Sequence, residues 1–75
     1  MDTAAILEEL ADILGTPPGT LTPETSLTTP GITWDSMALL AYLAFLKYHF
    51  NRTLPNVSCA TFQTVNDLLK EAKQP

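Results

Sequence analysis

Residues 35–50, DSMALLAYLAFLKYHF, hold the longest apolar run of the chain, which covers residues 37–46. This run is about half as long as a membrane-spanning helix requires, so we expect no membrane insertion. Asp35 and Ser36 can each cap a helix, because their side-chain oxygens accept hydrogen bonds from free N–H groups of the first turn. Asn51 follows and can end it. The segment therefore predicts a helix from about residue 35 to about residue 50.

The predicted helix is apolar on every side, and helices of this kind are normally buried on every side. A chain of 75 residues is too short to surround such a helix completely. We therefore expect some of its apolar residues to face solvent or a partner, from the set Ala38, Leu39, Ala41, Tyr42 and Phe45.

The segment before this helix predicts an amphipathic helix followed by a long loop. Apolar side chains in residues 4–14 recur at the spacings of one helical face, with Thr3 as the expected N-cap and Gly15 as the expected end. Residues 16–34 contain four of the six prolines. Three apolar residues spaced along this loop predict that it is ordered against the core: Leu21, Leu27 and Ile32.

The segment after the central helix predicts a short turn and a last helix. Residues 56–60 are too few for a full helix, so we expect a single turn there with Val57 pointing inward. Thr64 can cap a helix that runs to about Lys73, and Asp67 stands at the third position of a capping box. No strand-like alternation is visible. The chain is therefore predicted to be one small all-α domain.

Composition excludes several classes of protein. Hydrophobic residues make up 45% of the chain, which is enough apolar side chain to argue against disorder. A net charge of −4 argues against a nucleic-acid surface. Cys59 is the only cysteine, so no internal disulfide can form, and a lone thiol is typical of a reducing compartment. The N-terminal residues do not resemble a signal peptide, so we expect a cytoplasmic protein.

The charges are unevenly distributed along the chain. Residues 1–35 carry six acids and no base, whereas residues 36–66 carry Lys47 and Arg52 and no acid. This division predicts either that the domain has different faces for different partners or that one of its faces avoids charge altogether.

The sequence offers no constellation of catalytic or metal-binding residues. Cys59 and His49 have no metal-ligand spacing around them. His49 and Ser36 lie 13 residues apart on one predicted helix, which separates them by roughly 20 Å and excludes direct proton transfer. We expect a protein that is not an enzyme. Ser36 stands out instead as an N-terminal helix hydroxyl where an attached phosphodiester would be favoured by the helix dipole.

Trp34-Asp35-Ser36-Met37 resembles the Asp-Ser-Leu/Met signature of the acyl carrier protein family. The resemblance covers nearly the whole chain, because further family-like pieces follow in the family's order and spacing. These are the first helix ending at Leu14-Gly15, the loop residues Thr25-Ser26-Leu27, the pair Leu54-Pro55, and residues 61–68, TFQTVNDL.

The resemblance implies an antiparallel four-helix bundle with a long loop between helices one and two and a short third helix. Ser36 would carry a 4′-phosphopantetheine arm, which a phosphopantetheinyl transferase takes from coenzyme A and whose thiol holds acyl groups as thioesters. Asp35 would orient the serine and contact the transferase, while that enzyme and its Mg²⁺ supply activation. The acyl cargo would lie between helices two and three, in a pocket lined by Leu40, Val57 and Phe62.

Two departures from the family pattern concern the approach to Ser36 and the partner surface. Thr33 replaces the glycine that the family usually has two residues before the aspartate. The second helix also lacks the acids with which typical members bind basic enzyme patches. We therefore expect unusual partners, including ketosynthases or acyltransferases of a specialised polyketide, lipid or secondary-metabolite pathway. The residues expected to bind them are Trp34, Met37, Ala38, Ala41, Tyr42 and Lys47.

Two alternatives remain open at the level of the sequence. One is a carrier of amino acids or aryl acids in nonribosomal peptide assembly, although the Gly-Gly-[His/Asp]-Ser type of loop is absent. The other is an unmodified helical adaptor that binds through its apolar second helix. The intact Asp35-Ser36 pair counts against the adaptor, which has no need of it.

Overall fold

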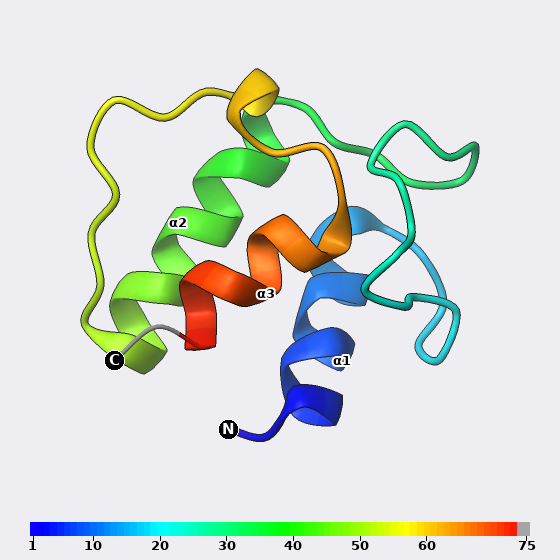
Figure 1. Ribbon diagram of the computed structural model, residues 1–75, viewed down its shortest axis with the longest axis horizontal. Coiled ribbons are helices and arrows are strands. Elements are labelled where there is room, and N and C mark those ends of the chain that lie inside the picture. The colour runs from blue at the N-terminus through cyan, green and yellow to red at the C-terminus, as the bar shows by residue number, and fades with distance from the viewer. Residues whose placement is uncertain (74–75) are drawn as a thin grey trace.

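The computed structural model describes residues 1–73, which form three α-helices and one 3₁₀ turn (Figure 1). The elements are α1 (Thr3–Leu14), α2 (Ser36–Phe50), η1 (Cys59–Thr61) and α3 (Val65–Lys73). No extended strand occurs within residues 1–73, where an isolated bridge joins Ser26 to Thr64. The all-α prediction is confirmed. A four-helix bundle is not shown, because the segment expected to form the third helix makes a turn of only three residues.

The limits of α1 follow from local backbone chemistry. Asp2, and not the predicted Thr3, is the N-cap, and its carboxylate accepts a 2.8 Å hydrogen bond from the Ala5 N–H. Thr3 already has helical geometry, so the prediction of this cap was wrong by one residue. Gly15 ends the helix with φ of 69°, a left-handed conformation that costs glycine little.

Helix α2 matches its predicted limits. Asp35 is the N-cap, and Asn51 ends the helix in a left-handed conformation with φ of 51°. One side of α2 is buried, and the residues on that side are Ala38, Leu39, Tyr42, Phe45 and Leu46. Of the five residues expected to share the exposed side, only Ala41 lies there.

The exposed side of α2 carries larger apolar residues than expected. Met37 is 78% exposed, Leu40 66% and Tyr48 85%. The exposed side was misassigned because a helix that is apolar all round has no polar face to mark it in the sequence. The neighbouring elements decide which side of such a helix is covered.

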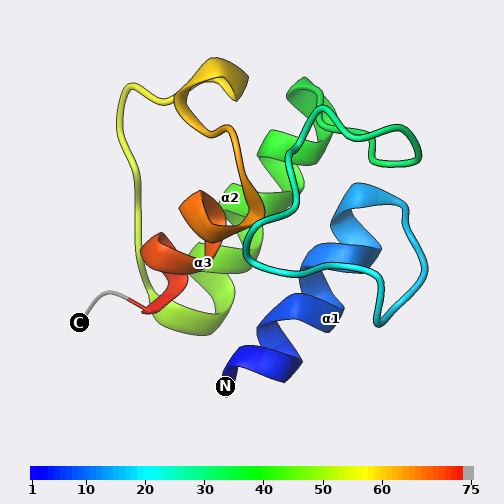
Figure 2. The ribbon, with the colours of Figure 1, turned by 45° about the vertical axis from the view of Figure 1, so that its right-hand side comes forward.

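The loop between α1 and α2 is held by the beginning of α3. Its backbone exchanges hydrogen bonds with residues 63–66: Leu27 donates to the Gln63 carbonyl at 2.9 Å, and Val65 donates to the Thr25 carbonyl at 2.9 Å. Leu21 and Leu27 are buried and Ile32 packs against the core, as predicted. The loop is therefore an ordered layer of the fold, beside α1 and the start of α3 in Figure 2.

Helix α3 completes the core across α1 and α2 (Figure 1). The predicted capping box is present: the Thr64 hydroxyl accepts from the Asp67 N–H at 3.3 Å, and the Asp67 carboxylate accepts from the Thr64 N–H at 3.1 Å. The apolar stripe of α3 is buried and comprises Val65, Leu68, Leu69 and Ala72. Among residues 1–73, no helix has the length and apolar character that crossing a bilayer requires.

Candidate functional site

Ser36 is the first residue of α2 and its side chain is exposed. The long loop delivers the chain to this point, and α2 begins near η1 (Figure 1). A hydroxyl in this position can be reached by another protein, because neither the loop nor the core covers it. The Ser36 hydroxyl is therefore accessible from solvent.

Asp35 fixes the start of α2 with both its side chain and its backbone. Its carboxylate accepts a 2.9 Å hydrogen bond from the Ala38 N–H, and its carbonyl accepts a 2.9 Å bond from the Leu39 N–H. These contacts fix the backbone on either side of Ser36. Asp35 therefore orients the serine through the helix cap, while its exposed carboxylate also remains open to solvent.

The beginning of α2 has backbone donors to spare. Within residues 1–73, the N–H groups of Ser36 and Met37 have no hydrogen-bond acceptor, whereas those of Ala38 and Leu39 are both occupied by Asp35. Free N–H groups and the positive end of the helix dipole favour an anion at this place. The residues present therefore fit the phosphodiester of a phosphopantetheine arm attached to the Ser36 Oγ.

An aromatic cluster of Trp34, Tyr42 and Phe62 supports the site from inside. The three rings meet edge to face, with centroid distances of 6.3 Å for Trp34–Tyr42, 6.1 Å for Trp34–Phe62 and 5.6 Å for Tyr42–Phe62. The Trp34 indole N–H donates a 2.9 Å bond to the Cys59 carbonyl. These contacts tie η1 to the residues that precede Ser36.

The cluster corrects part of the predicted partner surface. Tyr42 is 0% exposed and Ala38 is 6% exposed, so neither residue can contact a partner from the folded domain. The physical reason is the helical period of α2, which puts both residues on its core side, where Tyr42 contacts Phe62 and bonds to Leu68 of α3. Trp34 is half-buried with its indole directed inward, so its first role is structural.

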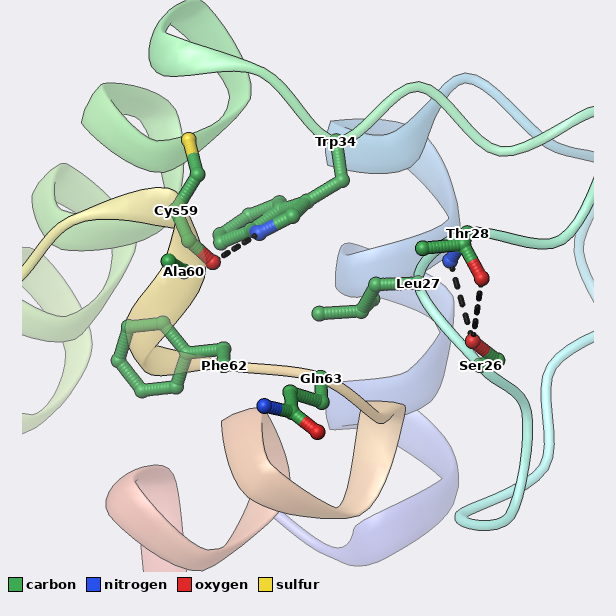
Figure 3. Close-up of a pocket in the computed structure, with 8 residues that line it drawn as sticks. All are labelled: Ser26, Leu27, Thr28, Trp34, Cys59, Ala60, Phe62 and Gln63. Carbon is green, nitrogen blue, oxygen red and sulfur yellow. Dashed lines mark hydrogen bonds between the residues drawn. The ribbon is translucent and has the colours of Figure 1, made fainter.

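A pocket of about 490 Å³ opens beside the cluster, between the loop and η1 (Figure 3). Leu27, Trp34 and Phe62 give it apolar walls. Its polar lining comes from Ser26 and Thr28 of the loop and from Gln63. The Cys59 side chain points away from the Leu27 side of the pocket in this view. The full lining comprises Ser26, Leu27, Thr28, Trp34, Cys59, Ala60, Phe62 and Gln63.

Of the three predicted cargo residues, one lines this pocket. Phe62 does so, whereas Val57 is half-buried against the core outside the pocket. Leu40 is 66% exposed on the outer side of α2, so its placement inside a cargo cavity was wrong. The helical period puts Leu40 on the side of α2 opposite Tyr42, which contacts the core.

The sequence did not reveal the polar part of the pocket lining. Ser26 and Thr28 lie about 35 residues from Gln63 along the chain, and the backbone pairing of the loop with residues 63–66 brings them together. The available signals were two family-like runs, Thr25-Ser26-Leu27 and residues 61–68, which contain Ser26 and Gln63 but do not by themselves indicate a pocket.

The remaining predicted partner residues lie on the outside of α2. Met37, Ala41 and Lys47 are exposed, and Lys47 Nζ donates a 2.9 Å bond to the Asn51 side chain. No acid lies on α2, so this surface is apolar with a positive charge toward its C-terminal end.

His49 and Cys59 lie in different elements of the fold, α2 and η1. His49 lies one residue before the end of α2, the end opposite Ser36, where its ring packs 4.9 Å from the Phe45 ring. Cys59 is a half-buried free thiol in η1. Within residues 1–73, no group of three or more histidine, cysteine or acidic side chains could hold a metal ion.

Comparisons of the chain with models of protein families, with curated proteins and with solved structures give no match.

Proposed function

We propose that this domain is a discrete acyl carrier protein in which Ser36 carries a 4′-phosphopantetheine arm. The observation that carries the proposal is the exposed Ser36 hydroxyl at the start of α2, directly after the Asp35 N-cap. On this proposal the Ser36 Oγ forms a bond to the pantetheine phosphate of coenzyme A. The Ser36 hydroxyl gives its proton to a base of the transferase, the bond between this phosphate and the adenosine bisphosphate breaks, and that nucleotide leaves.

The start of α2 gives chemical support to this attachment. A phosphodiester on Ser36 would lie beside the free N–H groups of Ser36 and Met37, which stabilise negative charge. Asp35 holds the backbone of this turn and offers its carboxylate to the transferase. The thiol of the attached arm supplies the thioester chemistry, while the protein presents and shields the cargo.

The pocket beside Trp34 and Phe62 is the proposed place for the part of the cargo closest to the arm. Trp34 precedes Ser36 by two residues, so the pocket and the attachment site share one short stretch of chain. In the wider arrangement, η1 takes the place of the short third helix in the proposed carrier bundle. The pocket would then be this protein's form of the cavity that carriers offer to acyl chains.

The proposed partners are a phosphopantetheinyl transferase and acyl-loading or acyl-processing enzymes, such as ketosynthases or acyltransferases, acting in the cytoplasm. Met37 and Ala41 offer these enzymes an apolar surface without negative charge, and Lys47 adds a positive charge to it. This polarity favours enzymes with apolar or acidic docking patches. It supports a place in a specialised polyketide, lipid or secondary-metabolite pathway.

The direct test is the mass of the protein after reaction with coenzyme A. The unmodified chain and its Ser36→Ala variant are incubated with coenzyme A, Mg²⁺ and a broad-specificity transferase, and intact masses are compared. We expect the wild type to gain the mass of one arm and Ser36→Ala to gain nothing. Thr29→Ala, which removes another exposed hydroxyl outside the pocket, is the control that should be modified like the wild type.

One observation favours a second candidate, an unmodified helical adaptor. The exposed side of α2 carries Met37, Leu40 and Tyr48. A partner protein could bind this apolar surface directly, with no phosphopantetheine arm attached to the domain. An absence of any Ser36-dependent mass gain across several transferases would favour this adaptor and contradict the carrier. The aminoacyl carrier of nonribosomal assembly has no comparable observation in its favour.

A further inference from the structure

A second pocket, of about 310 Å³, lies at the C-terminal end of α2, where the chain leaves the helix toward η1. In Figure 1 the segment that leaves the helix runs along the outside of α2. The pocket shares no residue with the one beside Trp34, so it is separate from the proposed cargo site. The residues that line it come from α2 and from this segment, and they are Leu43, Lys47, Arg52, Thr53 and Leu54.

The lining of this pocket carries positive charge. Lys47 and Arg52 are the only bases in residues 36–66, a stretch that has no acid, and both of them line the pocket. Glu71 of α3 forms an ion pair with Arg52 at 2.8 Å and balances one of the two charges. The charge of Lys47 remains, because its ammonium contacts only the neutral Asn51 side chain among the described residues. The pocket therefore favours an anionic group, although the whole chain has a net charge of −4.

Both bases also have hydrogen-bond donors to offer. Arg52 donates from Nη2 to the Glu71 carboxylate, but its buried Nε–H has no acceptor among the described residues. Lys47 donates a 2.9 Å bond to Asn51, which leaves further N–H groups of the ammonium unbound. Carboxylates accept strong charge-assisted bonds from such donors. Because one net positive charge remains, the pocket suits a singly charged carboxylate better than a doubly charged phosphate.

The surface around the pocket indicates a peptide as the ligand and not a small molecule. Lys47 and Thr53 are exposed, so the pocket is open at the surface. Leu40 and Ala44 are exposed as well, and their helical spacing places them on the same side of α2 as Lys47. An apolar strip of α2 therefore leads to the basic pocket. A small anion would leave this strip uncovered, whereas a longer ligand can bind both.

The backbone on the other side of the pocket can also bind a peptide. Within residues 1–73, the backbone N–H and carbonyl groups of Thr53 and Leu54 form no hydrogen bond with another backbone group. A bound peptide can pair with such groups through its own backbone, as peptides do at exposed strand edges. This wall therefore offers contacts that do not depend on the side chains of the ligand.

We propose that this pocket and the adjoining strip of α2 dock a segment of a partner protein in which an acidic side chain is flanked by apolar residues. The carboxylate would bind Lys47 and the remaining donors of Arg52, while the apolar neighbours would contact Leu40 and Leu54. For the proposed carrier, this segment would belong to a partner enzyme, and in that role the inference rests on the proposed function. The docking itself requires no arm on Ser36.

Docking can be tested by NMR on the unmodified protein. The ¹⁵N-labelled chain is titrated with the peptide acetyl-Gly-Leu-Glu-Leu-Gly-amide and, separately, with its glutamine analogue, which has the same size and no charge. We expect the glutamate peptide to shift the signals of Leu43, Lys47, Arg52 and Thr53. It should bind about threefold to fivefold more tightly than the analogue, the effect of one exposed ion pair. Equal affinities, shifts confined to other residues or an absence of shifts would overturn the docking site.

A third titration distinguishes a peptide from a small anion. Propionate carries the carboxylate of the glutamate side chain without a peptide backbone or apolar neighbours. It should bind about tenfold more weakly than the glutamate peptide, because it cannot cover the apolar strip of α2. Equal affinities of propionate and the peptide would overturn the peptide as the ligand.

Variants separate the pocket from general electrostatics. Lys47→Gln leaves the Arg52–Glu71 pair intact and should weaken binding of the glutamate peptide about threefold to fivefold, while binding of the glutamine analogue stays unchanged. Lys70→Gln removes an exposed base of α3 that does not line the pocket, and it should change both affinities less than about twofold. Equal losses of glutamate-peptide binding in the two variants would contradict a specific site.

The docking site and the carrier function fail in different measurements. If Ser36 gains no arm but the glutamate peptide binds as expected, the carrier function is contradicted and the docking site stands. If Ser36 is modified normally but the two peptides bind equally, the docking site alone is overturned.

Discussion

The hydroxyl of Tyr42, in the middle of α2, donates a 2.7 Å hydrogen bond to the backbone carbonyl of Leu68 in α3. Tyr42 is 0% exposed, so this bond lies inside the core and joins two helices through residues that are 26 positions apart in the sequence. The same ring packs edge to face on Trp34 and Phe62. Tyr42 therefore connects the helix packing to the residues that precede Ser36.

Tyr42→Phe should lower the free energy of unfolding by about 1 kcal/mol, because it removes one buried hydrogen bond and keeps the packing of the ring. Urea denaturation followed by circular dichroism measures the change. Tyr48→Phe is the matched control: Tyr48 is 85% exposed, and its variant should unfold like the wild type. Equal stability of the two variants would contradict the role given to the Tyr42 hydroxyl.

The stability of the domain should also fall at alkaline pH. Burial raises the pKa of Tyr42 above its ordinary value of 10.0, and the charge of Glu71 raises it further. The unfolded chain therefore loses this proton near pH 10 while the folded chain keeps it, so the unfolding free energy falls as the pH rises above about 10. Urea midpoints measured from pH 8 to pH 11 should decline less steeply in Tyr42→Phe than in the wild type. Parallel pH dependences of the two proteins would refute the role given to Tyr42 in the alkaline loss of stability.

Asp67 should make α3 sensitive to acid. Its carboxylate accepts hydrogen bonds from the Gln63 and Thr64 N–H groups, and these bonds lower the pKa of Asp67. A carboxylate whose pKa is lowered by folding stabilises the folded chain at pH values above its ordinary pKa of 3.8. This stabilisation is lost as the pH falls through the lowered pKa of the folded chain. Asp67→Asn should therefore reduce the thermal midpoint at pH 7, and its difference from the wild type should shrink by pH 2. A difference that is constant with pH would contradict this cause.

Asp35 variants can separate helix capping from recognition by the transferase. Asparagine caps about as well as aspartate, so Asp35→Asn should retain most of the stability, whereas Asp35→Ala should cost about 1 kcal/mol. If the carboxylate contacts the transferase, Asp35→Asn should still slow arm attachment about tenfold, as expected from the loss of a charge-assisted contact. Unchanged attachment rates, measured by intact mass over time, would limit Asp35 to its capping role.

The two sides of α2 should respond very differently to a new charge. Ala41→Glu places a carboxylate on the exposed side and should change the unfolding free energy by less than about 0.5 kcal/mol. Tyr42→Glu buries an unpaired acid and should cost more than about 4 kcal/mol. Circular dichroism with urea titration compares them. A folded Tyr42→Glu chain would show that the core side of α2 has been misassigned.

The helices were predictable because their signals are local. Asp35 and Asn51 mark the ends of α2 by their own chemistry, and the apolar spacing of α3 gives both its type and its buried face. Thr3 was misplaced as a cap by one residue, since Asp2 and Thr3 are both good N-cap residues and the competition between them is decided by backbone geometry.

The candidate site was predictable only where neighbours in the sequence form it. Ser36 and Asp35 are adjacent, so their arrangement follows from the helix start. The Tyr42 hydroxyl bonds to Leu68 of another helix, and the pocket beside Trp34 depends on the pairing of the loop with residues 63–66, neither of which a single sequence encodes locally. For the same reason Leu40 was placed inside the protein, although it lies on the outer side of α2.

The hydrogen bonds between residues 23–27 and residues 63–66 give the two connecting segments unequal tolerance to changes in length. An inserted residue between Pro23 and Leu27 would shift this pairing and pull Leu27 out of the core. The segment after Arg52 carries no such pairing until η1 begins, so it can absorb an insertion near Pro55. Evolution can therefore lengthen the segment between α2 and η1 more easily than residues 23–27 of the loop that leads to Ser36.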